Sequence, residues 1–329
     1  MTKRVLFIGG TGQISLSCVE AAMAAGDEVT VFNRGATDAD LPKGVAKVAG
    51  DHADDTAFDA ATRDGFDVVC QFIAYTADQV TRDLEMLKGR IGQYIFISSA
   101  SAYKKPVDAF PITEDVPLDN PYWEYSRRKT EAEAAIRAQD AVPWTIVRPS
   151  HTVRTQLPGA LGERDRMGDR LRLGLPMIVP GDGTSLWTLT RSEDLAVPFV
   201  RLFGREEALG EAFHITADHA YTWDQITRAV ADLLEVQVEI VHVPTDALVA
   251  RKPDLEGPLM GDRIWTVTFD NSKVKRVAGD FACERDLHEV LRAPVEHYRQ
   301  RAGKAAPQKT DLDRLFDAII ADQRRVATG

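Results

Sequence analysis

Tyr125 and Lys129 are four positions apart and could together move a proton to or from a substrate oxygen. They lie in PYWEYSRRKTEAEAAI, whose pattern predicts a helix at 122–139, so both side chains should leave the same face. A phenol has a pKa of about 10 in water, too high for a base at neutral pH. A neighbouring cation favours the phenolate, and we expect Lys129 to supply such a charge.

A third candidate group is the hydroxyl of Ser99 in FISSASAY, a serine-rich stretch at the end of a predicted strand. Ser99 could hold the substrate oxygen while Tyr125 transfers its proton. A Tyr-x-x-x-Lys pair alone is common on solvated helices, so the prediction depends on this combination. We therefore predict Ser99, Tyr125 and Lys129 as the catalytic residues.

The segment Gly9-Gly10-Thr11-Gly12 follows a predicted strand and precedes a predicted helix. In that context, glycines let the backbone approach a dinucleotide pyrophosphate, and the helix N-terminus supplies N–H groups. Ser15 replaces the usual third glycine and is small enough to keep most of the helix–strand contact. The alternative is a purely structural turn. The predicted cofactor contacts here are Gly9, Gly10, Thr11, Gly12, Gln13 and Ile14.

Asn33 and Arg34 end the second predicted strand, where NAD-binding units usually carry an acidic residue. Arg34 could receive a 2′-phosphate, which favours NADP, although NAD remains open because Asn33 could bind the ribose while Arg34 stacks on adenine. Asp51 in GDHAD could accept from the adenine amino group or act as a turn or N-cap carboxylate. The other predicted cofactor contacts are His52, Ile73, Ala74, Tyr125 and Lys129, and an oxidised nicotinamide would add its own positive field at Tyr125.

Apolar β-rich runs alternate with helical patterns along the first half of the chain. The strand candidates are 4–9, 28–33, 45–50, 67–73, 93–99 and 144–149, and the helices are roughly 13–25, 55–63, 76–89 and 122–139. This spacing is typical of βαβ units with a buried parallel sheet. The predicted fold class is α/β, with a doubly wound Rossmann sheet and a smaller C-terminal substrate-binding lobe.

The alternation ends after residue 150 in a stretch rich in glycine and proline. We expect a dinucleotide-binding domain at 1–150, to which the chain returns at about 185–217. Residues 151–184 and 218–302 are expected to form a substrate-binding lobe. Residues 303–329 are predicted to be a linker and a last helix. Leu312, Leu315, Phe316, Ile319 and Ile320 share one face of that helix, which should pack on the body or on a second subunit of a homodimer.

Composition narrows the functional classes. The 329 residues include 40 Lys+Arg and 50 Asp+Glu, giving a net charge of −10 without a basic block, so nucleic acid is an unfavourable partner. Three widely spaced cysteines indicate reduced core residues of a cytoplasmic protein. No signal peptide or membrane span is expected. The seven histidines show no paired metal-ligand spacing, so no metal is predicted.

The chain resembles the extended short-chain dehydrogenase/reductase family, the NAD(P)-dependent epimerases and dehydratases, over roughly residues 3–300. The motifs that carry the resemblance are GGTGQIS, FNRG, GDHAD, SSASAY, YSRRK, VRPSHTV, SEDLA and FDNSKVKR. The later motifs are most similar to the branch of chloroplast stem-loop-binding proteins and their bacterial relatives. The resemblance implies catalytic roles for Ser99, Tyr125 and Lys129. It also implies cofactor contacts from Gly9, Gly12, Arg34 and Asp51.

Two departures from that family concern the substrate. His151 replaces an asparagine that usually touches the substrate in sugar-nucleotide epimerases, and Arg191 replaces a histidine. His151 could donate to a substrate oxygen or be structural. The predicted substrate contacts are Ser101, Tyr103, His151 and Arg191. Trp187 and Trp265 could line the pocket or fill a core.

Two functional classes follow. The first is an NAD(P)-dependent oxidoreductase or epimerase that acts on a secondary alcohol or ketone of a sugar-like or sugar-nucleotide substrate. The second is a non-catalytic protein that keeps the cofactor fold and binds RNA or a protein partner. The acidic balance and the complete set of Ser99, Tyr125 and Lys129 favour the enzyme.

Overall fold

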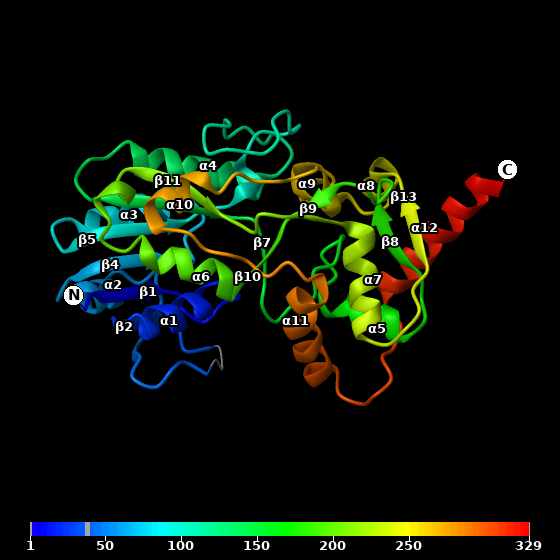
Figure 1. The fold of residues 1–329 in the computed structure, drawn as a ribbon, viewed down its shortest axis with the longest axis horizontal. Helices are drawn as coiled ribbons and strands as arrows, with labels where there is room; N and C mark the ends of the chain where they lie inside the picture. Colours follow the sequence, from blue (N-terminus) through cyan, green and yellow to red (C-terminus); the bar gives the residue numbers. More distant parts are fainter. Residues whose placement is uncertain (1, 37–39, 329) are drawn as a thin grey trace.

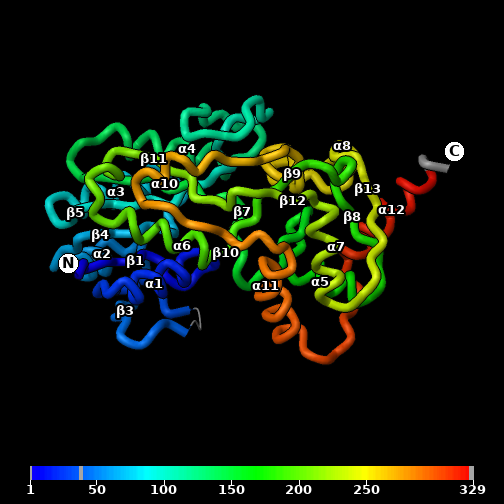
Figure 2. Tube along the Cα trace, viewed as in Figure 1, coloured from blue at the N-terminus to red at the C-terminus, as the bar shows by residue number. Residues whose placement is uncertain are grey.

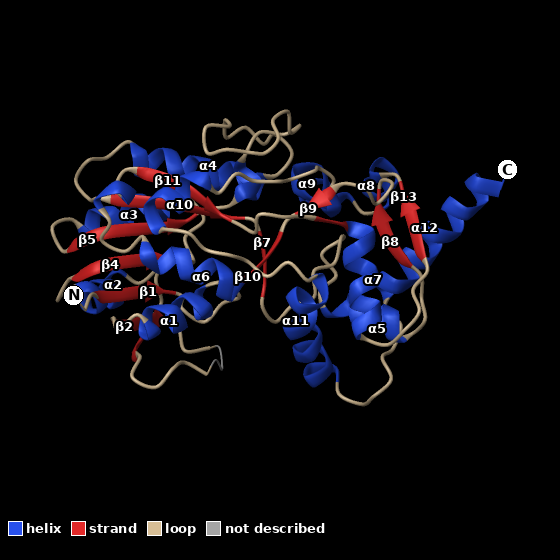
Figure 3. Cartoon of the chain, viewed as in Figure 1, coloured by secondary structure: helices blue, strands red, loops and turns tan. Residues whose placement is uncertain are grey.

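A computed structural model of the chain describes residues 2–36 and 40–328. Two lobes lie along the longest axis, with the N-terminus in the first and the C-terminal helix at the far end of the second (Figure 1, Figure 2). The long strands belong to the first lobe, and short strand pairs and helices make up the second (Figure 3). Within the described ranges, none of the helices has the length and apolarity needed to cross a membrane.

A seven-stranded sheet organises the first lobe, in the order β11-β6-β5-β4-β1-β2-β3. Every neighbouring pair is parallel, so the carboxyl ends of the strands share one edge. Val5 of the central strand pairs with Val29 on one side and Val68 on the other. The strands are β1 Arg4–Ile8, β2 Glu28–Asn33, β3 Ala46–Ala49, β4 Phe66–Gln71, β5 Ile91–Ile97, β6 Trp144–Pro149 and β11 Glu211–Ile215. The sheet confirms the predicted fold class.

Helices cover both faces of this sheet, because its central strands are apolar on both sides. Helices α1, α6 and α10 pack against one face, and α2, α3 and α4 pack against the other. Their bounds are α1 Ser15–Ala24, α2 Asp55–Thr62, α3 Ala77–Leu87, α4 Glu124–Arg137, α6 Ser192–Arg201 and α10 Ser272–Ala278. Placing α10 here departs from the predicted boundary, which put 218–302 in the second lobe. Buried Val274 and Ala278 explain the difference, since they join the core beneath α6.

The second lobe contains three two-stranded sheets and a set of helices around a large core and a smaller one. Its strands are β7 His151–Val153, β8 Met177–Pro180, β9 Leu186–Trp187, β10 Leu189–Arg191, β12 Tyr221–Thr222 and β13 Ile240–Val243. Its helices are α5 Asp165–Arg172, α7 Trp223–Leu233, α8 Thr245–Arg251, α9 Glu256–Pro258, α11 Leu287–Ala302 and α12 Asp311–Thr328. Shorter turns are η1 Ala100–Ala102, η2 Glu206–Ala208, η3 Pro253–Leu255 and the π-helical η4 Leu259–Arg263. Strands β7 and β10 pair where the lobes meet.

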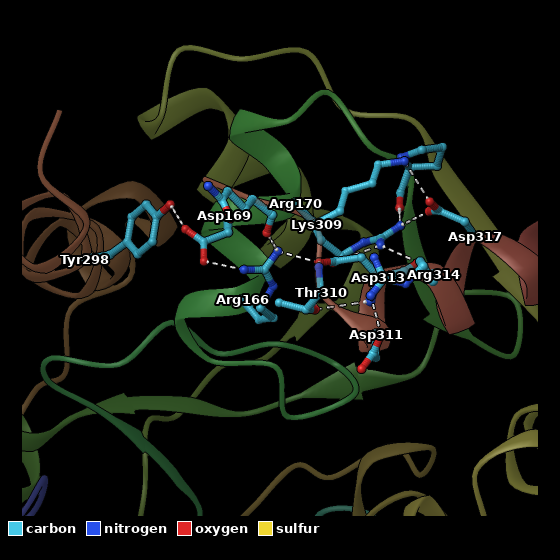
Figure 4. Close-up of polar contacts among 12 residues, drawn as sticks. Arg166, Asp169, Arg170, Tyr298, Lys309, Thr310, Asp311, Asp313, Arg314 and Asp317 are labelled. Carbon is cyan, nitrogen blue, oxygen red and sulfur yellow. Dashed lines mark hydrogen bonds and ion pairs between the residues drawn. The ribbon is translucent and has the colours of Figure 1, made fainter. Parts of the chain in front are cut away.

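Helix α12 is anchored to α5 by a buried ionic cluster (Figure 4). Arg170, fully buried, donates to the carboxylates of Asp313 at 3.1 Å and Asp317 at 3.0 Å. Arg166 donates to the second oxygen of Asp313 at 2.5 Å. The apolar face predicted for this helix packs on the second lobe, with Phe316, Ile319 and Ile320 in a core that includes Leu161 and Leu259. The homodimer stays a prediction.

Candidate functional site

Three adjoining cavities follow the carboxyl edge of the sheet. The outer cavity, about 410 Å³, lies beside Arg34 and Asp51. The central cavity, about 420 Å³, shares Gly9 and Tyr75 with the outer one and lies over the start of α1. The inner cavity, about 250 Å³, shares Ser99 and Tyr125 with the central one and extends toward the second lobe.

The glycine turn forms the floor between the outer and central cavities. Gly9 has φ 111° and Gly10 has φ 69°, conformations that favour glycine. A Cβ on Gly10 would lie 2.7 Å from Val31, so the turn also packs tightly on β2. Together with the N-terminus of α1 and the adjoining cavities, this tight turn fits the pyrophosphate of a dinucleotide cofactor.

Ser15 does more than replace a glycine. Its hydroxyl accepts a hydrogen bond from the Gly12 N–H at 2.8 Å, which fixes the end of the turn. The neighbouring Gln13 pairs across the lobes with Thr155: its amide nitrogen donates to Thr155 Oγ1 at 2.5 Å, and its oxygen accepts from the Thr155 N–H at 3.0 Å. Thr11 and Ile14 line the central cavity as well. These residues bring the second lobe close to the predicted pyrophosphate position.

At the end of β2, the two candidates for the ribose have different surroundings. The Asn33 amide donates to the Gly9 carbonyl at 3.2 Å and accepts from the Gly35 N–H at 2.8 Å, so it holds the turn. Arg34 is exposed and lines the outer cavity. Within residues 2–36 and 40–328, its guanidinium makes no hydrogen bond or ion pair. Arg34 is therefore the available donor at this end of the site.

Asp51 and His52 both line the outer cavity, but only Asp51 is exposed. The Asp51 carboxylate accepts from the Ala53 N–H at 3.0 Å, as in a turn. His52 is buried, and its Nε2 lies 2.7 Å from the carboxylate of the fully buried Asp83. Gln71 also donates to Asp83, at 2.5 Å.

The loop after β4 connects this buried cluster to the central cavity. The Gln71 side-chain oxygen accepts from the N–H groups of Ile73 at 2.8 Å and Ala74 at 3.1 Å. Ile73 is 37% exposed and lines both the outer and central cavities. Ala74 is fully buried, and its backbone carbonyl accepts a hydrogen bond from the Lys129 ammonium. Tyr75, which the sequence did not indicate, lines both cavities.

Tyr125 and Ser99 lie together where the central and inner cavities meet. Burial raises the pKa of the Tyr125 phenol to about 12, and a hydrogen bond with the Ser99 hydroxyl opposes that shift. The Ser99 hydroxyl is held by Ser101, whose Oγ lies 2.9 Å away, and Ser126 donates to the same Ser101 oxygen at 2.8 Å. The phenol is thus protonated and can donate to a substrate oxygen.

The Lys129 ammonium is held by two backbone carbonyls, and Lys129 is not among the groups that shift the pKa of Tyr125. Its ammonium, 2% exposed, donates to the carbonyls of Ala74 at 2.8 Å and Ile97 at 2.7 Å and lies 4.7 Å from the centre of the Tyr75 ring. Burial lowers the pKa of Lys129 to about 7, and the Glu133 carboxylate opposes this shift. The arrangement places Lys129 at the central cavity, one helical turn from Tyr125, with its charge directed at the strand ends.

The predicted substrate contacts separate into two groups. Ser101 and His151 line the inner cavity. Burial, with the nearby Arg263 charge, lowers the pKa of His151 to about 3, so its imidazole is neutral and can donate or accept one hydrogen bond.

The structure places two of the predicted substrate contacts, Tyr103 and Arg191, outside the inner cavity. Tyr103 is fully buried, and its hydroxyl bonds His214 Nδ1 at 3.0 Å and Arg148 at 3.1 Å. Arg191 pairs with both oxygens of Asp194, at 3.0 and 2.7 Å. Neither side chain lines the inner cavity, because each is held by other side chains of the protein.

The inner cavity also contains residues that no motif indicated. Trp123, Asp262 and Arg263 line it together with Val267 and Phe269. Trp187 and Trp265, for which the sequence left a pocket or a core position open, do not line the inner cavity. Trp187 is 1% exposed and stacks on Trp223 in the core, and Trp265 is half-buried with its indole N–H on the Met260 carbonyl at 2.6 Å.

Among residues 2–36 and 40–328, no group of three or more His, Cys, Asp or Glu side chains could hold a metal ion. The cavities are lined by hydroxyls, charged side chains and the glycine turn. These residues suit hydride and proton transfer with an organic cofactor.

Comparisons with known proteins agree with this geometry. A family model described as NAD(P)H-binding matches residues 9–166. The chain is 30% identical over 258 residues to the chloroplast stem-loop binding protein of 41 kDa b of Arabidopsis thaliana, covering 73% of this chain and 66% of that protein. It is 27% identical over 289 residues to 2′-dehydrokanamycin reductase of Streptomyces kanamyceticus, covering 85% of this chain and 80% of that enzyme.

Among solved structures, the fold is similar to an epimerase of Methanothermobacter thermautotrophicus. The TM-score is 0.75 at 17% identity, over 95% of this chain and 94% of that chain. The likeness extends over both lobes, so the second lobe belongs to the shared architecture as well as the sheet.

Proposed function

Because the chain belongs to the extended short-chain dehydrogenase/reductase family, we propose that it is an NAD(P)-dependent oxidoreductase or epimerase that acts on a secondary alcohol or ketone of a sugar-like substrate. The observation that carries this proposal is the position of Ser99 and Tyr125, which line the central and inner cavities alike. One cavity would hold the nicotinamide end of the cofactor and the other the substrate. The two hydroxyls would then face the reacting oxygen.

The roles of the residues follow from their contacts. Bound NAD(P) would supply the hydride chemistry, held by the glycine turn, Ile73 and Lys129. Tyr125 would give its proton to the substrate oxygen during reduction and take it back during oxidation. Ser99, held by Ser101, would keep that oxygen in place. Lys129, on its two carbonyls, would position the cofactor ribose beside Tyr125.

The inner cavity supports a sugar-like substrate. It combines the aromatic surfaces of Trp123 and Phe269 with hydrogen-bonding groups from Ser150, Asp262 and Arg263. Aromatic faces cover the apolar side of a sugar ring, while the polar groups bind its hydroxyls.

We also infer a preference for NADP, because Arg34 is exposed in the outer cavity and the Asn33 amide already holds the turn.

A second candidate rests on the name of one relative. The chloroplast protein is named as a stem-loop binding protein, so a cofactor-fold scaffold that binds RNA or a protein partner is the alternative. The net charge of −10 weighs against RNA as a partner.

We also propose that the protein works in a reducing compartment such as the cytoplasm, which the buried free thiols of Cys18 and Cys70 support.

The proposal is tested by native mass spectrometry followed by a substrate screen. The first measurement reports whether the purified protein retains NADP or NAD. The screen then follows nicotinamide absorbance with sugars, sugar acids, sugar phosphates and sugar nucleotides, using both cofactors. Turnover that depends on Tyr125 supports the enzyme. Binding of a structured RNA at physiological salt, without turnover of any compound, supports the alternative and overturns this proposal.

A further inference from the structure

The π-helical turn η4, Leu259–Arg263, places two oppositely charged neighbours in the inner cavity. Asp262 and Arg263 line the same cavity as Ser99 and Tyr125. Arg263 also lines a smaller neighbouring cavity of about 200 Å³. Turns of the π type are rare and frequently occur at functional sites.

The first lobe fixes this turn relative to Tyr125. The Asn120 amide donates to the carbonyls of Gly261 and Ser101, both at 2.7 Å, which joins the turn to the serine loop. Trp123, which directly precedes α4, packs against Gly261 so closely that a Cβ there would lie 2.6 Å from the Trp123 Cβ. Asp262 and Arg263 are therefore held in position by the same segment that presents Tyr125.

The two charged side chains face the cavity without a direct partner among the described residues. Within the described residues 2–36 and 40–328, the Asp262 carboxylate and the Arg263 guanidinium make no hydrogen bond and no ion pair. Both are partly removed from water, and burial lowers the pKa of Arg263 and raises that of Asp262. A desolvated charge without a partner is costly, and here both groups face open space that a ligand could fill.

The surroundings of Arg263 favour an anion. Arg164 lines the smaller cavity beside it and adopts φ 52°, an unusual conformation for a residue other than glycine. Glu163 acts on Arg263 through its charge, but its carboxylate accepts from the Leu161 N–H at 3.0 Å. A planar guanidinium with free donors matches the geometry of a carboxylate or a phosphate.

We propose that Asp262 and Arg263 form a recognition pair for a polyhydroxylated acid, with a substrate hydroxyl donating to Asp262 and an oxyanion of the same molecule binding Arg263. This inference rests on the proposed function and narrows its substrate class. The oxyanion could be a carboxylate or a phosphate, and the two sources share this chemistry. Neutral sugars lack the group that Arg263 binds.

The test is a direct binding measurement, so that it does not depend on turnover. The protein is saturated with the cofactor identified by mass spectrometry and titrated calorimetrically with glucose, glucuronate, glucose 6-phosphate and UDP-glucose. We expect glucuronate or glucose 6-phosphate to bind roughly 10-fold to 100-fold more tightly than glucose. The comparison of the two acids identifies the source of the oxyanion, and UDP-glucose tests whether a nucleotide is needed.

Three variants locate the effect. Arg263→Gln should remove the advantage of the acids, and Arg263→Lys should retain part of it as a point charge. Asp262→Asn should weaken the hydroxylated probes while the preference for an oxyanion remains. Arg228→Gln, which removes an exposed arginine of α7 on the same lobe, is the matched control and should leave binding unchanged. Unchanged cofactor affinity in each variant shows that the fold is intact.

The outcomes separate this inference from the proposed function. If the acids bind no better than glucose, if none of the acid probes binds, or if Arg263→Gln has no effect, the recognition pair is overturned, even for an enzyme with measured turnover. If the acids bind through Arg263 but no probe is turned over, the pair is supported and the proposed catalysis is not.

Discussion

The Lys129 ammonium lies 2.8 Å from the carbonyl oxygen of Ala74, in the loop that follows β4. A second bond, to the Ile97 carbonyl at 2.7 Å, ties it to the end of β5. The ends of two sheet strands thus determine the position of this lysine. Its hydrogen bonds join those two segments, and the pKa of Tyr125 is set by burial and by its hydrogen bond with Ser99.

The first prediction concerns pH and stability. Burial lowers the pKa of Lys129 to about 7, whereas an unfolded lysine titrates near ~10.4. Between these values the unfolded chain binds more protons at this position, so its contribution to the free energy of unfolding rises with pH. The slope approaches about 1.4 kcal/mol per pH unit. Lys129→Met should remove it.

Urea unfolding of the cofactor-free protein from pH 7 to pH 10 checks this prediction. The difference between wild type and Lys129→Met should increase in favour of wild type as the pH rises. Lys43→Met corrects for the loss of an exposed lysine. A difference that stays constant across the range would contradict the prediction.

The second prediction concerns proton transfer. Tyr125→Phe keeps the ring and its packing against Trp123 but removes the hydroxyl that Ser99 holds. Turnover should fall by about 10²–10⁴, the usual contribution of a general acid–base group. Cofactor affinity should hardly change, as measured by fluorescence titration.

Tyr122→Phe is the matched control for that change, since Tyr122 lies three residues earlier and does not line the inner cavity. Its rate should equal that of wild type. Full turnover in Tyr125→Phe would show that the proposed mechanism is wrong.

The third prediction concerns the choice of cofactor. Arg34→Ala should weaken NADP binding by roughly 1.5–3 kcal/mol, the range for hydrogen bonds to charged groups, and change NAD binding little. Dissociation constants for both cofactors test this directly. Arg63→Ala, a surface arginine paired with Asp59, is the control. Equal, small losses for both cofactors would remove the inferred preference for NADP.

The strands and helices of the first lobe could be predicted from the sequence because each is a short apolar run or an amphipathic segment bounded by turn-forming or capping residues. The glycine turn has a local cause as well, since Gly9 and Gly10 adopt conformations that suit glycine within a few residues of their strand. Ser99 follows β5 at the carboxyl edge of the sheet, and Tyr125 lies in the first turn of α4 beside that edge, so both line the same cavities.

The rest depends on contacts between distant segments. Tyr103 looked available in the serine-rich loop, yet Arg148 and His214 from β6 and β11 enclose its hydroxyl. Asp262 and Arg263 carry no motif, and contacts of η4 with Trp123 and Asn120 bring them to Tyr125. No local sequence pattern predicts these contacts, because the partners are separated by 45 residues for Tyr103 and Arg148 and by 111 for Tyr103 and His214.

The fourth prediction concerns the anchor of α12. Asp313→Ala leaves Arg170 buried without its main partner, so the free energy of unfolding should fall by about 3–5 kcal/mol. Asp311, two residues before Asp313, is an exposed partner of Arg314. Asp311→Ala should lower the free energy of unfolding by no more than about 1 kcal/mol. Urea unfolding of both variants gives the comparison. Equal effects would show that the buried cluster contributes no more than a surface pair.

The edge strand β11 pairs with β6 only after the chain has left the sheet at residue 149 and returned at residue 211. Loss of the second lobe would release both ends of that excursion and open the sheet edge, and loss of the sheet edge would free the excursion in turn. The two lobes of Figure 1 should therefore unfold in a single cooperative transition, with coincident changes in far-ultraviolet circular dichroism and tryptophan fluorescence. Contacts of such high sequence separation also imply slow folding, because the loop must close before the edge strand can pair.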